Sequence, residues 1–145
     1  MKILLTLVSL SLLLFAQTPY MLTKYKSAYP LVEIHTDKVP QKYKKELTNL
    51  IKEYTDKLKI DTKGYSQRVI GIMVSRVAIG SGLVLKLQLL VGEDVKRLDD
   101  NEEVFAITYQ KSDIFEVENL EEDIVDSAEY LLSEFEEQYK EDNEE

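Results

Sequence analysis

The sequence predicts an α+β protein, a two-layer sandwich in which two amphipathic helices lie on one face of a mainly antiparallel sheet. Three observations predict this class. Two segments carry apolar residues at helical spacing, three consecutive strand-like segments lie between them, and a short apolar segment precedes the first helix. The predicted order is therefore β-α-β-β-β-α. Each helix must bury its apolar stripe, and one sheet face can bury both.

Residues 1–16, MKILLTLVSLSLLLFA, have the features of a secretory signal peptide. Lys2 supplies positive charge before an apolar run from Ile3 to Phe15, which is shorter than the roughly 20 residues that span a bilayer. Ala16 is the best small residue for cleavage. We therefore expect an exported chain, periplasmic or secreted, with no membrane span in its mature part. An uncleaved anchor is the alternative.

The next segments predict a linker followed by the start of a single domain over residues 31–139. Residues 17–30 contain three tyrosines and no clear period, which favours a linker or arm. Residues 31–35, LVEIH, predict a short strand. Asp37 and Pro40 are helix-start signals, and the helix that follows has an apolar stripe formed by Tyr43, Leu47, Leu50, Ile51, Tyr54 and Leu58.

Two strands joined by a glycine turn are expected after this helix. Residues 68–78 are apolar and rich in β-branched side chains, and Gly80-Ser81-Gly82 suits a hairpin turn. In residues 83–91 the alternation of leucine with Lys86 and Gln88 predicts one buried and one polar face.

A third strand and a closing helix complete the domain. Residues 92–102 predict a polar connection, with a short strand or bulge of its own as the alternative. Residues 103–111 are then expected to place Phe105, Ile107 and Tyr109 on one face. Asn119 and Glu122 have the spacing of a capping box. The helix that they begin buries Leu120, Ile124, Ala128, Leu131, Phe135 and Tyr139. Residues 140–145 are expected to be an acidic, disordered tail.

The composition excludes several kinds of chemistry. The chain has no cysteine, which excludes a disulfide framework, a zinc–thiolate site and a lipid anchor on cysteine. His35 is its one histidine, so a Ser-His-Asp triad and a histidine-rich metal site have no basis. We expect His35 to be a polar surface residue at a strand end. The sequence therefore predicts no enzyme, no cofactor and no metal.

Charge is divided along the chain. Residues 17–76 hold 12 Lys and Arg against 6 Asp and Glu, whereas residues 77–145 hold 5 against 21. Such a chain balances its charge internally when it folds, or presents faces of opposite sign to a partner. The overall net charge of −9 makes nucleic acid a poor partner.

Two sets of polar side chains are candidate partner-binding residues. One is the polar sheet face, and the other is the lysine-rich side of the first helix. The sheet set is Lys86, Gln88, Thr108 and Gln110, with Val104 and Ala106 making that face partly apolar, and the helix set is Lys42, Lys45 and Lys52. Their identity as a partner surface rests on exposure and charge alone.

A small-molecule or cation-binding protein is the alternative function. A pocket between the sheet and the helices would be lined by Tyr43, Tyr54, Tyr109 and Tyr139, although these residues also suit the edge of a core. The acidic residues of segments 93–94 and 99–103 offer oxygen ligands for Ca²⁺, but they lack the spacing of an EF-hand.

The run KELTNLIKEYTDKLKI, the run RVIGIMVSRVAIGSGLVLKLQLLVGEDVKRLDDNEEVFAITYQ and the closing helix together resemble a known bacterial domain. It is the domain shared by the amino-terminal part of TolB and by the curli-secretion protein CsgG. The resemblance spans about residues 31–139 and lies in topology and hydrophobic spacing, so no functional residue is carried over. It implies a non-enzymatic interaction module of the bacterial envelope, and we expect an envelope protein as the partner.

Overall fold

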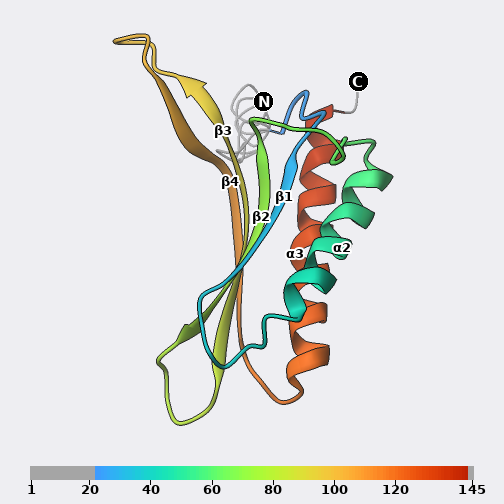
Figure 1. The fold of residues 1–145 in the computed structure, drawn as a ribbon, viewed down its shortest axis with the longest axis vertical. Helices are drawn as coiled ribbons and strands as arrows, with labels where there is room; N and C mark the ends of the chain where they lie inside the picture. The colour runs from blue at the N-terminus through green and yellow to red at the C-terminus, as the bar shows by residue number, and fades with distance from the viewer. Residues whose placement is uncertain (1–21, 144–145) are drawn as a thin grey trace, which may run out of the picture.

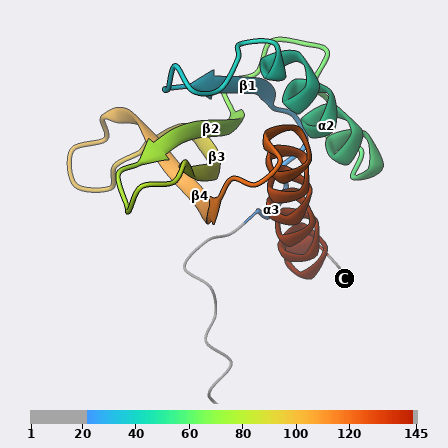
Figure 2. The ribbon, with the colours of Figure 1, turned by 90° about the horizontal axis from the view of Figure 1, so that it is seen from below.

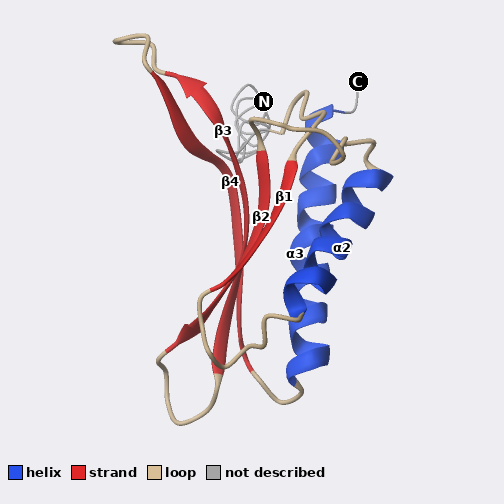
Figure 3. Ribbon diagram, in the orientation of Figure 1, coloured by secondary structure: helices blue, strands red, loops and turns tan. Residues whose placement is uncertain are grey.

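The computed structural model describes residues 22–143, and the predicted signal peptide of residues 1–16 lies outside them. The predicted order of elements is confirmed. The elements are β1 (Tyr29–Ile34), α2 (Tyr43–Lys57), β2 (Val69–Val77), β3 (Val84–Lys96), β4 (Glu103–Glu116) and α3 (Leu120–Asn143). Both helices lie on the same side of the sheet, as predicted (Figures 1 and 3).

The described residues form a four-stranded sheet in the order β1-β2-β3-β4. Strand β1 pairs with β2 in parallel, because the chain returns through α2 before it enters β2. The other two pairs are antiparallel. The backbone N–H groups of Tyr29 and His35 donate to the carbonyls of Arg68 and Val74, so the backbone N–H groups of the even-numbered residues between them face the outer edge. Pro30 lies at this edge, where its missing N–H costs no ladder bond.

Strands β3 and β4 form a hairpin that is longer than the sequence predicts. The expected connection of residues 92–102 is wrong for residues 92–96, which continue β3, and β4 extends to Glu116. The far end of this hairpin projects beyond the other strands (Figure 1). Polar residues can continue both strands here because the backbone N–H and C=O groups of one strand pair with those of the other. This pairing does not depend on the type of side chain.

A β-bulge interrupts the hairpin. Val91 pairs with Tyr109, but the next residue, Gly92, pairs with Ile107, so Thr108 is an extra residue on β4. The prediction that Phe105, Ile107 and Tyr109 share a face is therefore wrong. Tyr109 is buried under the helices, whereas Phe105 and Ile107 line the opposite side of the sheet.

The core lies between the sheet and the two helices. Alternate residues of β2 and β3 point toward the helices and are fully buried, together with the centres of the predicted stripes of both helices. The ends of these stripes are partly buried at the margin of the core. The ring of Phe135 makes edge contacts with Tyr109 at 5.6 Å and Tyr25 at 6.2 Å between centroids. Helix α3 therefore packs on strand β4 and on the segment before β1 at once.

Polar side chains on the helix-facing side of β4 attach α3 to the edge of the sheet. Lys111 Nζ lies 2.9 Å from Glu134 Oε2, and this hydrogen bond raises the pKa of Lys111. The Ser127 hydroxyl donates to Asp113 Oδ2 at 2.8 Å. These pairs explain why β4 carries charged residues opposite the buried leucines of β3.

The two ends of the described chain are joined. Leu22, Tyr25 and Ala28 are buried in the core, so of the two alternatives, a linker or an arm, residues 22–28 form an arm packed on the domain. The Leu22 N–H donates to Asp142 Oδ2 at 2.6 Å, and the Asn143 amide donates to the Leu22 carbonyl at 3.0 Å. The expected disordered tail is wrong for residues 140–143, which belong to α3. Residues 17–21 and 144–145 lie outside the description.

The start of α3 also differs from the predicted capping box. The carboxylate of Asp123 accepts hydrogen bonds from the backbone N–H groups of Glu118 and Asn119, each at 2.8 Å. The Asn119 side chain instead donates to the Glu122 carboxylate at 3.1 Å. The helix begins where the sequence predicts, but a carboxylate one position further along satisfies the free donors that precede it.

Replacing Asp142 and Asn143 together by alanine is expected to lower the free energy of unfolding by about 1–3 kcal/mol, because partly buried backbone groups of the amino-terminal segment lose their partners. Urea denaturation measures the change. Glu141→Ala, on the same turn and exposed, is the matched control and is expected to have little effect. Equal stability of the double variant and the control would show that the end of α3 does not hold the amino-terminal segment.

Candidate functional site

The candidate site is the face of the sheet that points away from the helices, which we call the open face. No helix of the described residues covers it (Figure 2). Strand pairing and alternation place its side chains in transverse rows. From the hairpin end downward these rows are Asp94 and Phe105; Tyr29, Val69, Gly92 and Ile107; Leu31, Gly71, Leu90 and Gln110; Glu33, Met73, Gln88 and Ser112; and Ser75, Lys86 and Ile114.

The open face exposes large apolar side chains from its two edge strands, β1 and β4. The exposed fractions are 52% for Tyr29, 40% for Leu31, 57% for Phe105, 48% for Ile107 and 54% for Ile114. All but Ile114 belong to the first three rows. Scattered apolar residues are normal on a protein surface, but a contiguous exposed group marks an interaction surface.

An apolar hollow of about 160 Å³ lies at the centre of this group. Two glycines within strands, Gly71 and Gly92, make room for it, because neither has a side chain to fill the space. The ring of Phe105 lies over Gly92, where a Cβ atom would come within 2.3 Å of the ring. The other lining residues are Leu31, Glu33, Val69, Ile72, Met73, Leu90 and Ile107.

Charged groups flank the hollow along the strands. Glu33 lines one end of it, and Lys44 Nζ contacts the Glu33 carboxylate from α2 at 3.5 Å. Asp94 pairs with Phe105 at the other end, is exposed, and forms no ion pair within residues 22–143. The hollow itself is therefore apolar, while a carboxylate lies at each of its two ends.

The predicted partner-binding residues do not form one surface. Lys86, Gln88 and Gln110 lie on the open face, as predicted. Thr108 is the bulge residue, and its hydroxyl oxygen is buried without a hydrogen-bond partner among the described residues. Placing it on the polar face was therefore wrong, because the sequence gives no sign of the bulge.

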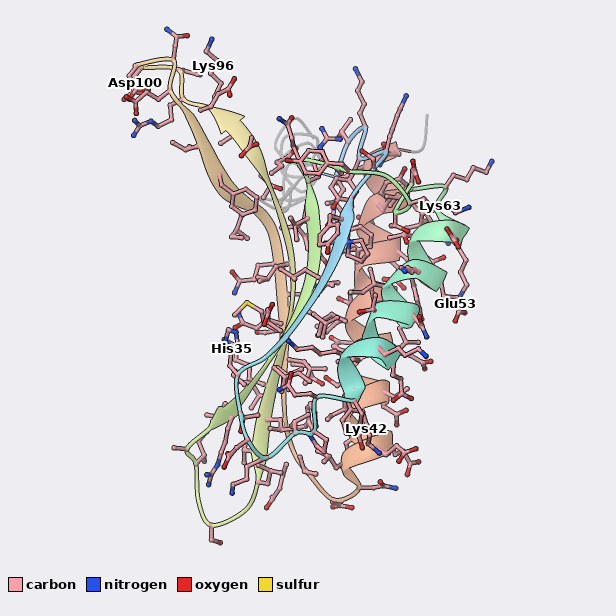
Figure 4. All side chains as sticks on the ribbon, viewed as in Figure 1. His35, Lys42, Glu53, Lys63, Lys96 and Asp100 are labelled. Atoms are coloured by element: carbon pink, nitrogen blue, oxygen red, sulfur yellow. The ribbon has the colours of Figure 1, made fainter. Side chains whose placement is uncertain are left out.

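The other predicted positions lie away from the open face. Lys45 and Lys52 are exposed on α2 and Lys42 is exposed immediately before it. This helix covers the opposite side of the sheet (Figure 4). Val104 and Ala106 pair with Val95 and Glu93 and face the helix side, so their predicted place on the open face is wrong. The structure therefore separates the lysines of α2 from the polar sheet residues. His35 follows the end of β1 and is exposed, as predicted.

Sequence reasoning missed the apolar centre of the open face. Phe105 and Ile107 were expected on the same face as Tyr109, and Leu31 and Tyr29 were not singled out. The available signal was the pair of glycines inside otherwise apolar strands, at Gly71 and Gly92. Glycine within a strand marks a bulge or a close approach to another group, and here Gly92 lies beside the bulge and beneath an aromatic ring.

A second hollow, of about 430 Å³ and polar, adjoins the base of the hairpin and is lined by Ser27, Tyr65, Ser66, Gln67, Arg68, Glu93 and Asp94. Arg68 Nε donates to Glu93 Oε2 at 2.8 Å, and the guanidinium lies 5.6 Å from the centre of the Tyr25 ring. Burial raises the pKa of Tyr25. The side chains of Arg68 and Glu93 thus already satisfy each other, which leaves no free charge between them to hold a ligand.

The tyrosines proposed to line a ligand pocket are divided between the core and its margin. Tyr43 and Tyr109 are buried, whereas Tyr54 and Tyr139 are half-buried at the edge of the core. Among residues 22–143, no group of three or more His, Asp or Glu side chains is arranged to hold a metal ion. Neither helix of this part of the chain has the length and apolarity that a membrane crossing requires.

Comparison with known proteins gives a distant likeness of fold. No family model and no curated protein matches the chain. Among solved structures, it is similar to a chain described as a minor lipoprotein from Acinetobacter baumannii. The two are 13% identical, the likeness covers 81% of this chain and 92% of that chain, and the TM-score is 0.38. A likeness of this degree is compatible with many functions.

Proposed function

We propose that this chain is an exported, non-enzymatic protein-binding module of the bacterial envelope, and that it binds its partner through the open face. The observation that carries the proposal is the contiguous apolar group around the hollow, which includes Leu31, Phe105 and Ile107. Burying such a group against another protein removes apolar surface from water at about 25 cal/mol per Å².

The composition of the open face suits a protein partner. Its apolar centre is bordered by amide, hydroxyl and charged side chains, including Gln88, Gln110, Ser112 and Lys86. Protein interfaces combine an apolar core with a polar rim in this way. Amide groups at the rim can donate to and accept from a partner backbone. The absence of cysteine and the single histidine leave few residues for catalysis.

Two features of the sequence support the compartment. The first sixteen residues have the charge, length and apolarity of a signal peptide. The resemblance to the TolB and CsgG domain implies an envelope setting as well. Both features point to a partner in the envelope.

The double variant Phe105→Ser, Ile107→Ser is expected to reduce partner binding at least tenfold while leaving stability nearly unchanged. Both side chains are about half exposed, and exposed substitutions usually change stability by about 0.5 kcal/mol or less. A photo-crosslinking residue at Gln110 would first identify the partner in the native envelope fraction. Binding of the purified partner is then measured by interferometry.

The matched control is Ile79→Ser, Tyr130→Ser, which removes apolar side chains that are 58% and 53% exposed outside the open face. It is expected to bind as the natural chain does. Full partner binding by the Phe105→Ser, Ile107→Ser variant, with thermal stability unchanged, would contradict the proposal.

A further inference from the structure

We infer that the partner segment bound by the open face is extended and basic: one large apolar side chain enters the hollow, and a lysine or arginine on each side pairs with Glu33 and Asp94. This inference rests on the proposed function and names the chemistry of the partner. It follows from the size of the hollow, the position of the two carboxylates and the charge of the hairpin.

The size of the hollow limits what it can hold. Its volume of about 160 Å³ is close to that of a cavity of ~150 Å³ that takes up a benzene molecule. It therefore admits one ring or one branched aliphatic side chain. The surrounding side chains of Leu31, Met73 and Leu90 are apolar, so a polar group placed there would lose its hydrogen bonds to water.

The two carboxylates mark the ends of the binding surface. Asp94 belongs to the first row of the open face, and Glu33 belongs to the fourth. Successive rows are two residues apart along a strand, so three steps of about 6.6 Å separate these rows by about 20 Å. An extended segment covers this distance in about six residues. Side chains of an extended segment alternate between its two faces, so positions 1, 3, 5 and 7 point toward the sheet. A cation at each end of a seven-residue segment, with the apolar residue at the third or fifth position, therefore matches the spacing.

Within residues 22–143, one of the two carboxylates is unpaired, and the other is contacted by a single lysine at 3.5 Å. Asp94 has no ion pair within the described residues, and the Glu33 side chain keeps 42% exposure beside Lys44. The nearest open-face cations lie beyond the two carboxylates, Lys86 below Glu33 and Lys96 above Asp94. No lysine that the structure describes on the open face therefore lies between Glu33 and Asp94, where it would repel a basic segment.

The hairpin strengthens the preference for a basic partner. Residues 93–103 contain six Asp and Glu against two Lys and Arg, and Arg97 is already paired with Asp100 and Glu102. Figure 4 shows Lys96 and Asp100 at the projecting end of this hairpin. The excess of carboxylates above the hollow attracts a cationic segment and raises its rate of association.

The test uses the capped heptapeptide Lys-Thr-Phe-Thr-Thr-Thr-Lys as the probe, titrated into the isotope-labelled mature chain and followed by amide chemical shifts. Shifts are expected at Gly71 and Gly92, in the floor of the hollow. Replacing both peptide lysines by glutamate is expected to weaken binding at least fivefold. Replacing the peptide phenylalanine by serine is expected to abolish the shifts, and raising the salt from 50 to 500 mM is expected to weaken binding severalfold.

The protein variant Glu33→Gln, Asp94→Asn is expected to lose at least fivefold in affinity for the lysine peptide and to bind the glutamate peptide no worse. Glu53→Gln, Glu118→Gln removes two exposed carboxylates elsewhere and is expected to change nothing. Equal binding of the lysine and glutamate peptides, or no shift at Gly71 and Gly92 with 5 mM lysine peptide, would overturn the inference. The proposed function fails separately, if the natural partner binds the Phe105→Ser, Ile107→Ser variant normally.

Discussion

Replacing Phe135 by alanine is expected to lower the free energy of unfolding by about 3–5 kcal/mol, the range found for deletion of a fully buried aromatic ring. Phe135 has no exposed surface, and its ring makes edge contacts with Tyr25 and Tyr109. The substitution opens a cavity where α3, β4 and the amino-terminal segment meet. Since the free energy of unfolding of a native protein is about 5–15 kcal/mol, this substitution is expected to remove a large fraction of the stability.

Urea denaturation of the mature chain measures this change. Tyr130→Ala is the matched control, because it removes an aromatic ring from the same helix at a position that is 53% exposed. We expect the control to lose less than about 1 kcal/mol. A Phe135→Ala variant as stable as the Tyr130→Ala control would mean that α3 is not packed on the sheet through this ring.

Stability is also expected to fall steeply above pH 10. Burial raises the pKa of the Tyr25 hydroxyl. The carboxylate of Glu93 raises this pKa further, and the guanidinium of Arg68 lowers it. Burial likewise raises the pKa of Tyr109, with Glu134 adding to it. In the unfolded chain a tyrosine titrates near pH 10. Below that pH both states hold the proton, and the full stability is present.

As the pH rises above 10, the unfolded state releases the tyrosine protons while the folded state still binds them. Each such tyrosine then lowers the free energy of unfolding by up to about 1.4 kcal/mol per pH unit. Tyr25→Phe removes one of them, together with a buried hydroxyl that has no hydrogen-bond partner among the described residues. At pH 12 this variant is expected to lose about 2–3 kcal/mol less than the natural chain.

Chemical denaturation at pH 8, 10, 11 and 12 gives the slopes to compare. Tyr130→Phe, which removes a hydroxyl from an exposed ring, serves as the control and is expected to follow the natural chain. A Tyr25→Phe variant that loses stability with the same slope as the natural chain would show that the Tyr25 hydroxyl titrates normally in the folded protein.

Local sequence patterns predicted the elements well because they depend on residues close together in the chain. The stripe through Leu47 and Ile51, and the stripe through Leu131 and Phe135, are buried as the helical spacing predicts. The alternation from Leu85 to Val91 placed the leucines in the core, and the glycine turn after β2 lies where it was expected.

The candidate site was predicted only in part. Lys86, Gln88 and Gln110 were assigned to the open face because each lies on the regular side of the bulge, where alternation holds. Phe105 and Ile107 lie beyond the bulge, and one extra residue at Thr108 moves both to the opposite face. Their place beside Leu31 also depends on the parallel pairing of β1 with β2, which joins residues about 40 positions apart.

The sequence alone therefore determined the α+β class, the order of the elements and the helix and strand faces that form most of the core, since these follow from the periods of 3.6 and 2 residues. The tertiary structure decided three further features: the bulge at Thr108, the contact of Leu22 with the end of α3, and the hollow between Gly71 and Gly92. Each of these depends on contacts between distant residues, whose energies no local pattern records.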